Sequence, residues 1–221
     1  MHRFLERAKL PGGLWMEPMA GEGAIIKAVN EKRSDVSWVA NELREECRPQ
    51  LIAIKPQVSV TIGDFFTLPP PKQYRSRITV SITNPAFSIA MEAIEHSLNF
   101  ADYVIHLLRL NFLGTERRNK FFQSNMPDVY VVPNRISFAL SVSCANNRKT
   151  GCDFAVILPL TAEVPRRCPK CGARTRVSTT DSIEYGWFVW TPERGRRVGK
   201  IEVLDHTPDE ERSVMDERRA A

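Results

Sequence analysis

Three apolar segments that each end in an acidic residue constrain the fold of this chain more than any other feature. They end at Glu17, Glu42 and Asp64, and a fourth apolar segment is stopped by Asn84-Pro85. Proline stops a strand because it has no N–H to donate and because it restricts the residue before it. Short apolar strands that alternate with helical patterns predict βαβ units in a parallel sheet. The polar residues then fall at the carboxyl ends of strands, where open α/β sheets bind ligands.

The remaining apolar patterns extend this α/β arrangement along the chain. They predict four helices: one over 3–9, one that follows the glycine turn and ends near 31, one over 88–99 and one over 113–125. They also predict strands over 101–110, 129–132 and 185–190. The strand over 101–110 is almost continuously apolar, as is typical of a parallel strand covered on both faces, and His106 within it is expected to be a core residue.

The first acidic residue is followed by a turn with two glycines, Gly21 and Gly23, which allow close approach of the backbone to a ligand. Glu42 lies at the distance along the chain where a carboxylate accepts hydrogen bonds from ribose hydroxyls. Asp64 is placed to accept from an adenine amino group while Phe65 packs on the ring. Each acid alone is also compatible with a turn residue or a helix cap. Three in equivalent positions indicate a cofactor that contains adenosine.

The order of these motifs resembles S-adenosylmethionine-dependent methyltransferases. It resembles more closely the amino-methyltransferases of DNA, which carry Asp/Asn/Ser-Pro-Pro-Tyr/Phe/Trp where this chain has Asn84-Pro85-Ala86-Phe87. The segments 108–114 and 184–190 are similar to small phage-type adenine methyltransferases. The resemblance implies an α/β, Rossmann-like methyltransferase fold: a mostly parallel seven-stranded sheet with an antiparallel edge strand.

The resemblance also implies a role for each motif residue. The side-chain oxygen of Asn84 and the carbonyl of Pro85 would accept hydrogen bonds from the target amine, and Phe87 would stack on the base. Ala86 stands where the family has a second proline, which lowers loop pre-organisation by about 0.4–1 kcal/mol but leaves both acceptors in place. The cofactor-binding residues would be Glu17, Pro18, Ala20, Gly21, Gly23, Glu42, Asp64, Phe65 and Asn84.

The resemblance favours methylation of adenine N6 in DNA after the base is flipped out of the stack. An RNA base or a protein side-chain amide can be held in the same way, so these substrates stay open. A nucleic-acid-binding relative that keeps the cofactor but has lost transfer also stays open. Cys47 lies in a charged helical segment away from the motif, so no cysteine nucleophile is indicated.

Four of the five cysteines fall in one stretch, with the spacing C-x7-C, 15 residues, C-x2-C. They are Cys144, Cys152, Cys168 and Cys171. Two cysteines that bracket a tight turn, followed by glycine, suit tetrahedral zinc, and four protein ligands make the zinc structural because no position stays open. Disulfides or unliganded thiols are the alternative. An odd cysteine count, no signal-peptide pattern and no apolar run of about 20 residues predict a cytoplasmic, non-membrane protein. The resemblance to phage-type enzymes implies a bacterial or phage-infected cell.

Basic residues surround the second cysteine pair. They are Arg166, Arg167, Lys170, Arg174 and Arg176, in a chain of net charge +5. They predict either phosphate contacts or compensation of the zinc-thiolate charge. The expected organisation is a methyltransferase core over 1–140, a zinc module over 141–177, the end of the core over 178–206, and a charged tail over 207–221. The expected partner is nucleic acid, DNA rather than RNA, and a homodimer is compatible with the sequence.

Overall fold

The computed structural model describes residues 1–68, 78–133, 140–146, 151–158, 162–178, 183–193, 195 and 197–206. It divides into two compact units, which we describe separately. The core unit contains Met1–Val132 and Tyr185–Asp205, and the cysteine unit is built on Pro133–Glu184. The predicted charged tail, 207–221, lies outside the described residues.

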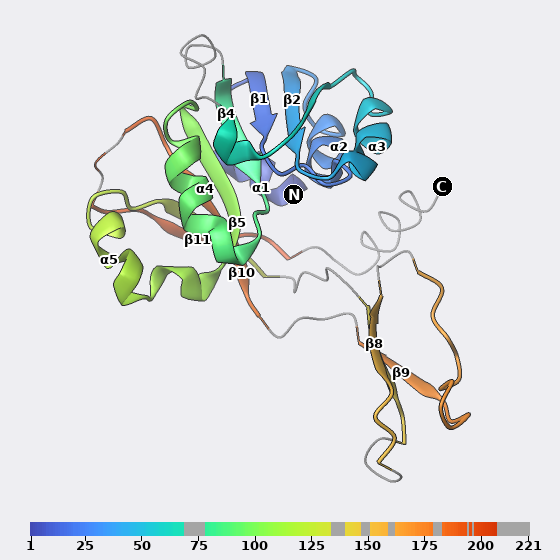
Figure 1. The fold of residues 1–221 in the computed structure, drawn as a ribbon. Helices are drawn as coiled ribbons and strands as arrows, with labels where there is room; N and C mark the ends of the chain where they lie inside the picture. The colour runs from blue at the N-terminus through green and yellow to red at the C-terminus, as the bar shows by residue number, and fades with distance from the viewer. Residues whose placement is uncertain are drawn as a thin grey trace. The chain divides into compact units, whose positions relative to one another are not determined.

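The core unit is an eight-stranded sheet in the order β11-β6-β10-β5-β4-β1-β2-β3, surrounded by short helices (Figure 1). Its strands are β1 (Gly13–Glu17), β2 (Val36–Glu42), β3 (Ser59–Ile62), β4 (Ile78–Thr83), β5 (Tyr103–Arg109), β6 (Asp128–Val132), β10 (Tyr185–Trp190) and β11 (Ile201–Val203). Its α-helices are α1 (His2–Ala8), α2 (Ala24–Asn30), α3 (Arg48–Ile52), α4 (Ala90–Ser97) and α5 (Glu116–Phe122). Its 3-10 turns are η1 (Glu45–Cys47), η2 (Phe65–Thr67), η3 (Phe87–Ile89) and η4 (Leu110–Leu113).

The sheet is mostly parallel, as predicted, but it has eight strands and not seven. The antiparallel strand is β10, which pairs with β5 on one side and β6 on the other. The additional strand is β11, which pairs parallel with β6 and so places two strands outside β10. β11 is only three residues long, which is too short for its apolar pattern to be recognised in the sequence.

The central strands β5 and β10 are buried on both faces of the sheet: five consecutive residues of β5 are buried, and neighbouring residues of a strand point to opposite faces. All six residues of β10 are buried. Phe188 and Trp190 belong to a core cluster that includes Ile94 of α4. Trp187, on the opposite face, stacks on Phe4 of α1 with ring centroids 5.1 Å apart. The prediction that the strand over 101–110 is covered on both faces is therefore confirmed.

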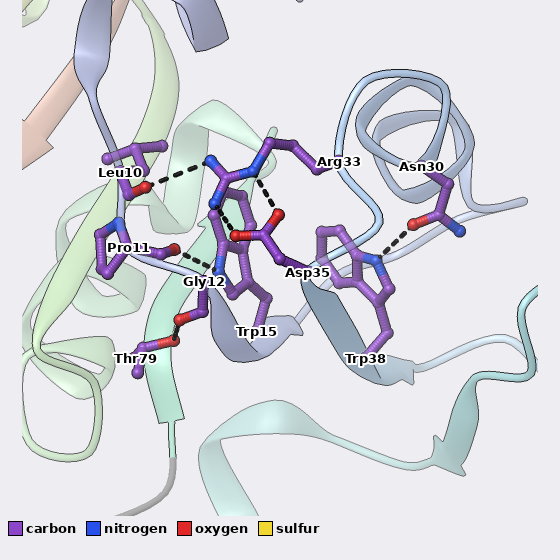
Figure 2. Close-up of polar contacts among 9 residues, drawn as sticks. All are labelled: Leu10, Pro11, Gly12, Trp15, Asn30, Arg33, Asp35, Trp38 and Thr79. Carbon is purple, nitrogen blue, oxygen red and sulfur yellow. Dashed lines mark hydrogen bonds and ion pairs between the residues drawn. The ribbon is translucent and has the colours of Figure 1, made fainter.

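A polar network ties together the amino-terminal ends of β1 and β2 (Figure 2). Arg33 forms two 2.7 Å hydrogen bonds with Asp35 and donates a third to the carbonyl of Leu10. Trp15 donates its indole N–H to the carbonyl of Pro11 at 3.1 Å, and the Arg33 guanidinium lies 5.5 Å from the Trp15 ring centroid. The carboxyl ends of the same strands carry Glu17 and Glu42, so this network holds the scaffold from the side away from the candidate site.

His106 lies in β5 and is fully buried, as predicted for a core residue. Its ring meets Trp190 edge-on at 6.2 Å, and neither of its nitrogens has a hydrogen-bond partner among the described residues. Burial lowers the pKa of His106 from 6.5 to about 3. The folded chain therefore keeps this imidazole neutral.

We expect this histidine to make the core unit unstable to acid. Because the folded pKa lies below the unfolded one, its contribution to stability is complete above about pH 6.5 and is lost as the pH falls toward 3. At pH 4.5 the loss is about 2–3 kcal/mol. The variant His106→Leu should show a pH dependence that is weaker by this amount.

Urea unfolding at pH 7.5 and pH 4.5 measures the effect. Tryptophan fluorescence reports the core unit, because all four tryptophans, Trp15, Trp38, Trp187 and Trp190, belong to it. The control is His206→Leu at an exposed histidine. Equal pH dependence in wild type and His106→Leu would contradict the prediction.

The cysteine unit contains a three-stranded antiparallel sheet in the order β8-β7-β9. Its strands are β7 (Leu140–Cys144), β8 (Ala155–Leu158) and β9 (Thr175–Ser178). Among the described residues of this unit, only Leu140, Val142, Cys144 and Cys168 are buried. So small an apolar core gives little stability, and units of this size usually need a further constraint such as a metal.

Candidate functional site

The polar residues predicted at the strand ends do come together at one edge of the core sheet. Glu17 ends β1, Glu42 ends β2, and Asn84 directly follows β4. Asp64 follows β3 as the cap of η2. Because β4, β1, β2 and β3 are neighbours and parallel, their carboxyl ends lie at the same edge.

The glycine turn after β1 is closed against Glu42. Gly21 and Gly23 both adopt left-handed backbone conformations, with φ of 53° and 78°. The N–H of Gly21 donates to Glu42 Oε2 at 2.7 Å. A Cβ atom on Gly23 would lie 2.3 Å from Cδ1 at the end of the Ile54 side chain, so that side chain would have to shift. Glycine at these two positions is therefore needed for the turn itself.

Asn41 holds this turn in place, and sequence reasoning missed it. Its side-chain N–H₂ group donates to the carbonyls of Pro18 and Gly63, both at 3.1 Å. These bonds link the turn after β1 to the turn after β3. The signal that could have found it is a buried amide one residue before the acidic end of β2.

Glu42 is buried and both of its oxygens hold donors. Besides Gly21, Arg44 donates its backbone N–H and its Nε to Oε1, at 3.2 and 2.9 Å. Burial alone would raise the pKa of Glu42, but the hydrogen bonds from Arg44 and Gly21 outweigh it and lower that pKa. Each carboxylate oxygen has two lone pairs, so an ionised Glu42 can still accept from a ligand hydroxyl.

Glu17 is 2% exposed and lies in a different environment. Burial raises its pKa well above 4.5, a backbone hydrogen bond from Ile26 opposes this, and the charge of Glu42 adds to the rise. Its Oε2 atom has no hydrogen-bond partner among the described residues. A buried carboxyl oxygen without a donor is costly, and a cationic ligand group would satisfy it.

Asp64 is exposed and accepts a hydrogen bond from the backbone N–H of Phe66 at 3.0 Å. Phe65 is only 3% exposed, because its ring packs edge-on against His96 and Phe100 at 4.7 and 5.6 Å. Phe66 is 36% exposed. Of the two aromatic rings, Phe66 therefore offers more surface to a ligand, which the sequence pattern did not distinguish.

The Asn84 amide oxygen is buried and has no hydrogen-bond partner among the described residues. Pro85 is buried after it, and Ala86 has φ −59° and ψ 130°. This φ lies within the range that proline imposes. The loop therefore has a proline-like backbone at the position where the resembled family has its second proline.

Phe87 is 38% exposed and contacts two residues that sequence reasoning did not assign. The Arg109 guanidinium carbon lies 4.3 Å from the Phe87 ring centroid. Tyr185 stacks on Phe87 with centroids 6.0 Å apart at an angle of 30°. Arg109 and Tyr185 are direct partners in the β5–β10 ladder, so two distant segments meet at the Asn84 loop.

The cysteine unit brings its four cysteines together. The sulfur atoms of Cys144, Cys152, Cys168 and Cys171 all lie within 4.8 Å of one another. Two of the separations are 3.4 Å, from Cys144 to Cys171, and 3.7 Å, from Cys152 to Cys168. Sulfurs bound to one tetrahedral zinc at about 2.3 Å lie about 3.8 Å apart, so the four thiols suit that ion.

Backbone N–H groups point at three of these sulfurs. Asn146 donates to Cys144 at 3.3 Å, Phe154 donates to Cys152, and Lys170 and Cys171 donate to Cys168. Such bonds favour thiolates and orient metal ligands. Gly172, with φ 70°, then closes the knuckle by donating its N–H to the Cys168 carbonyl at 2.9 Å.

The predicted basic cluster is exposed on the knuckle and β9. Arg167 and Arg174 face each other in an isolated antiparallel bridge. Lys170 differs from the others because its ammonium forms a 2.7 Å ion pair with Asp153. Its charge is therefore partly compensated within the unit.

Comparison with solved structures identifies the fold. A predicted O-methyltransferase from Agrobacterium tumefaciens is 11% identical with a TM-score of 0.52, covering 95% of this chain and 90% of that chain. A DNMT2 mutant from Spodoptera frugiperda is 10% identical with a TM-score of 0.49, covering 88% and 56%. A precorrin-6y C5,15-methyltransferase from Geobacter metallireducens is 11% identical with a TM-score of 0.45, covering 86% and 87%.

The first of these matches shows that the core has a Rossmann-like methyltransferase fold, as the motifs implied. No protein-family model matches the sequence. No curated protein matches it significantly. Within the described part of the chain, no helix is long and apolar enough to cross a membrane.

Proposed function

We propose that this protein is an S-adenosylmethionine-dependent methyltransferase that acts on the exocyclic N6 amine of adenine in DNA. The observation that carries the proposal is the Asn84 amide oxygen. It is buried without a partner among the described residues, at the sheet edge that also carries Glu17 and Glu42. A buried acceptor without a donor is unfavourable, and an amine N–H of a substrate satisfies it.

The residues at the strand ends fit the cofactor. Glu42 would accept from the ribose hydroxyls, Asp64 from the adenine amino group, and the unpaired oxygen of Glu17 from the ammonium of the methionine part. Phe65 and the more exposed Phe66 would lie beside the adenine. Pro18, Ala20, Gly21 and Gly23 would form the turn around the methionine part. The bound cofactor supplies an electrophilic methyl group on a sulfonium.

The chain itself positions the nucleophile. Asn84 Oδ1 and the Pro85 carbonyl each accept one N–H of the target amine, which directs the nitrogen lone pair away from both acceptors. Phe87 holds the plane of the base. The target nitrogen, held in this way, would accept the methyl group that the cofactor supplies and would release one proton to solvent. Catalysis of this kind depends on positioning and electrostatics and needs no covalent enzyme intermediate.

Nucleic acid is the proposed substrate class because the exposed arginines of the cysteine unit, Arg166, Arg167, Arg174 and Arg176, together with Lys170, suit phosphate contacts. The same acceptor pair would hold an amine of RNA or a protein amide. The one observation that favours a weak, binding relative is Ala86. Its φ of −59° keeps the geometry of the loop, so we rank that alternative lower.

We also propose that Cys144, Cys152, Cys168 and Cys171 bind one structural zinc ion. The mutual distances of the four sulfurs and the backbone N–H groups directed at them support this assignment. All four ligands come from the chain, so the ion has no open position for catalysis.

Transfer of a radiolabelled methyl group to DNA, RNA and protein, followed by nucleoside analysis, tests the main proposal. We expect label in DNA as N6-methyladenine. Label only in RNA or only in protein would show that RNA or protein, and not DNA, is the substrate. Binding of the cofactor without any label would show that the chain is a non-catalytic relative.

The variant Glu42→Gln should weaken cofactor binding about 10- to 100-fold. A neutral amide accepts less strongly than a carboxylate, and hydrogen bonds to charged groups contribute about 1.5–3 kcal/mol. Isothermal titration with S-adenosylhomocysteine measures this. The control is Glu45→Gln, since Glu45 is exposed and pairs with Arg48 on the surface. An unchanged dissociation constant for Glu42→Gln would show that Glu42 does not bind the cofactor.

A further inference from the structure

Arg109 combines a charge and an unsatisfied buried donor at the candidate active site. It is the last residue of β5, and β5 pairs in parallel with β4, the strand that leads into Asn84. Its Nε atom is buried and has no hydrogen-bond partner among the described residues. Its guanidinium lies 4.3 Å from the Phe87 ring centroid.

The contact with Phe87 explains the position of the guanidinium but not its hydrogen bonding. A cation over an aromatic face leaves the N–H groups, which lie in the guanidinium plane, free to donate sideways. Leaving a charged donor buried and unpaired is costly, so this arrangement calls for an acceptor from outside the described chain. The residue opposite Arg109 in the ladder is Tyr185, whose ring packs on Phe87 with the centroids 6.0 Å apart.

The nature of the acceptor follows from the donor. A planar guanidinium with several N–H groups is the side chain best suited to phosphate, which it binds through charge-assisted hydrogen bonds. Phe87, the residue proposed to hold the target base, is in direct contact with it. A nucleotide whose base lies on Phe87 has its own backbone phosphate within a few bonds of that base.

We infer that Arg109 forms an anion subsite that binds a backbone phosphate of the nucleic-acid substrate at or next to the target nucleotide. This inference rests on the proposed function and adds to it a phosphate contact beside the target nucleotide. It is separate from the basic residues of the cysteine unit, because Arg109 belongs to the core unit.

The test compares a charged and an uncharged backbone that carry the same bases. The probes are a fluorescein-labelled single strand of ten deoxyadenosines and a peptide nucleic acid of the same base sequence. Affinities are measured by fluorescence anisotropy over a range of salt concentrations, with wild type, Arg109→Gln and Arg109→Lys. The matched control is Arg117→Gln, which removes the same charge from a side chain that is 89% exposed in the core unit.

For Arg109→Gln we expect about a tenfold loss of affinity for the DNA strand. The slope of log affinity against log salt should fall by about 0.7, the value for one phosphate contact to a single strand. Binding of the peptide nucleic acid should not change. Arg109→Lys should keep the salt slope with a smaller loss of affinity, and it serves as the test if Arg109→Gln does not fold. Arg117→Gln should change the DNA affinity less than threefold.

An unchanged salt slope in Arg109→Gln, or an equal loss for both probes, would overturn the phosphate subsite. A lost salt slope in a folded Arg109→Lys would overturn it as well. Methyl transfer and cofactor binding by wild type are recorded in parallel, so the two ideas fail separately. If wild type methylates DNA while Arg109→Gln binds DNA with unchanged affinity and salt slope, the proposed function is supported and the phosphate subsite is refuted. If wild type neither binds the DNA strand nor transfers a methyl group to DNA, both the proposed function and the phosphate subsite are refuted.

Discussion

Replacing Asn84 with alanine is expected to reduce methyl transfer about 100- to 1,000-fold while cofactor binding persists. A loss of this size in the rate is typical when one hydrogen-bonding group that contacts the reacting atoms is removed. The amide oxygen of Asn84 is buried and unpaired among the described residues, so its removal breaks no internal hydrogen bond recorded there. The acids that would hold the cofactor, Glu17 and Glu42, lie on other strands.

Two further variants make this prediction specific. Asn84→Asp keeps an acceptor oxygen in place and should retain more transfer than Asn84→Ala, since aspartate occupies this position in part of the resembled family. Asn111→Ala removes an amide from an exposed position in η4 and should leave transfer unchanged. Single-turnover rates separate the chemical step from binding. Transfer by Asn84→Ala at the wild-type rate would refute the role of Asn84 as the amine acceptor.

The parts of the site that the sequence predicted are those set by local pattern. Glu17 and Glu42 end β1 and β2, and Asp64 and Asn84 closely follow β3 and β4. Parallel pairing of these strands alone therefore brings the four residues to one edge. The glycine turn is equally local, because left-handed backbone at Gly21 and Gly23 depends on the residues themselves.

The parts that the sequence did not predict depend on partners far along the chain. Arg109 meets Tyr185 only through the register of β5 with β10. In the sequence, the residues of the cysteine unit, Pro133–Glu184, lie between the two. Adjacent aromatic rings at the end of β3 look equivalent in sequence. The fold buries Phe65 against α4 and leaves Phe66 more exposed. The edge strand β11 is likewise defined by its pairing with β6 and not by its own pattern.

Ala86, which replaces the second proline of the resembled family's motif, shows that the structure is needed to judge the effect of such a difference. Loss of a proline matters in two ways: it changes the backbone geometry of the folded loop, or it adds freedom to the unfolded chain. With φ at −59°, the folded loop already has the geometry that proline would impose. The effect of alanine is therefore one of rigidity, and both acceptors, Asn84 Oδ1 and the Pro85 carbonyl, stay in the same backbone frame.

Purified, reduced protein is expected to contain one zinc ion per chain, and Cys168→Ser should lose it. Apparent free energies of zinc binding to four-ligand sites are about 10–16 kcal/mol near neutral pH. Loss of the ion should therefore unfold the cysteine unit, which has few buried apolar residues of its own among those described. Cys168 is the buried member of the knuckle and accepts two backbone N–H bonds, so serine, with its harder and less acidic oxygen, should disrupt the site strongly.

The matched control is Cys47→Ser. Cys47 is also buried, but it belongs to the core unit and lies outside the four-sulfur cluster. Metal content by elemental analysis should be one per chain in wild type and in Cys47→Ser, and close to zero in Cys168→Ser. Cofactor binding by the core unit should persist in all three, since the sulfurs and the strand-end acids belong to different units. If the wild type contains no metal and all five thiols can be alkylated without prior reduction, the cysteines are unliganded thiols and the zinc proposal is wrong. If the wild type instead contains two intact disulfides, the disulfide alternative is correct.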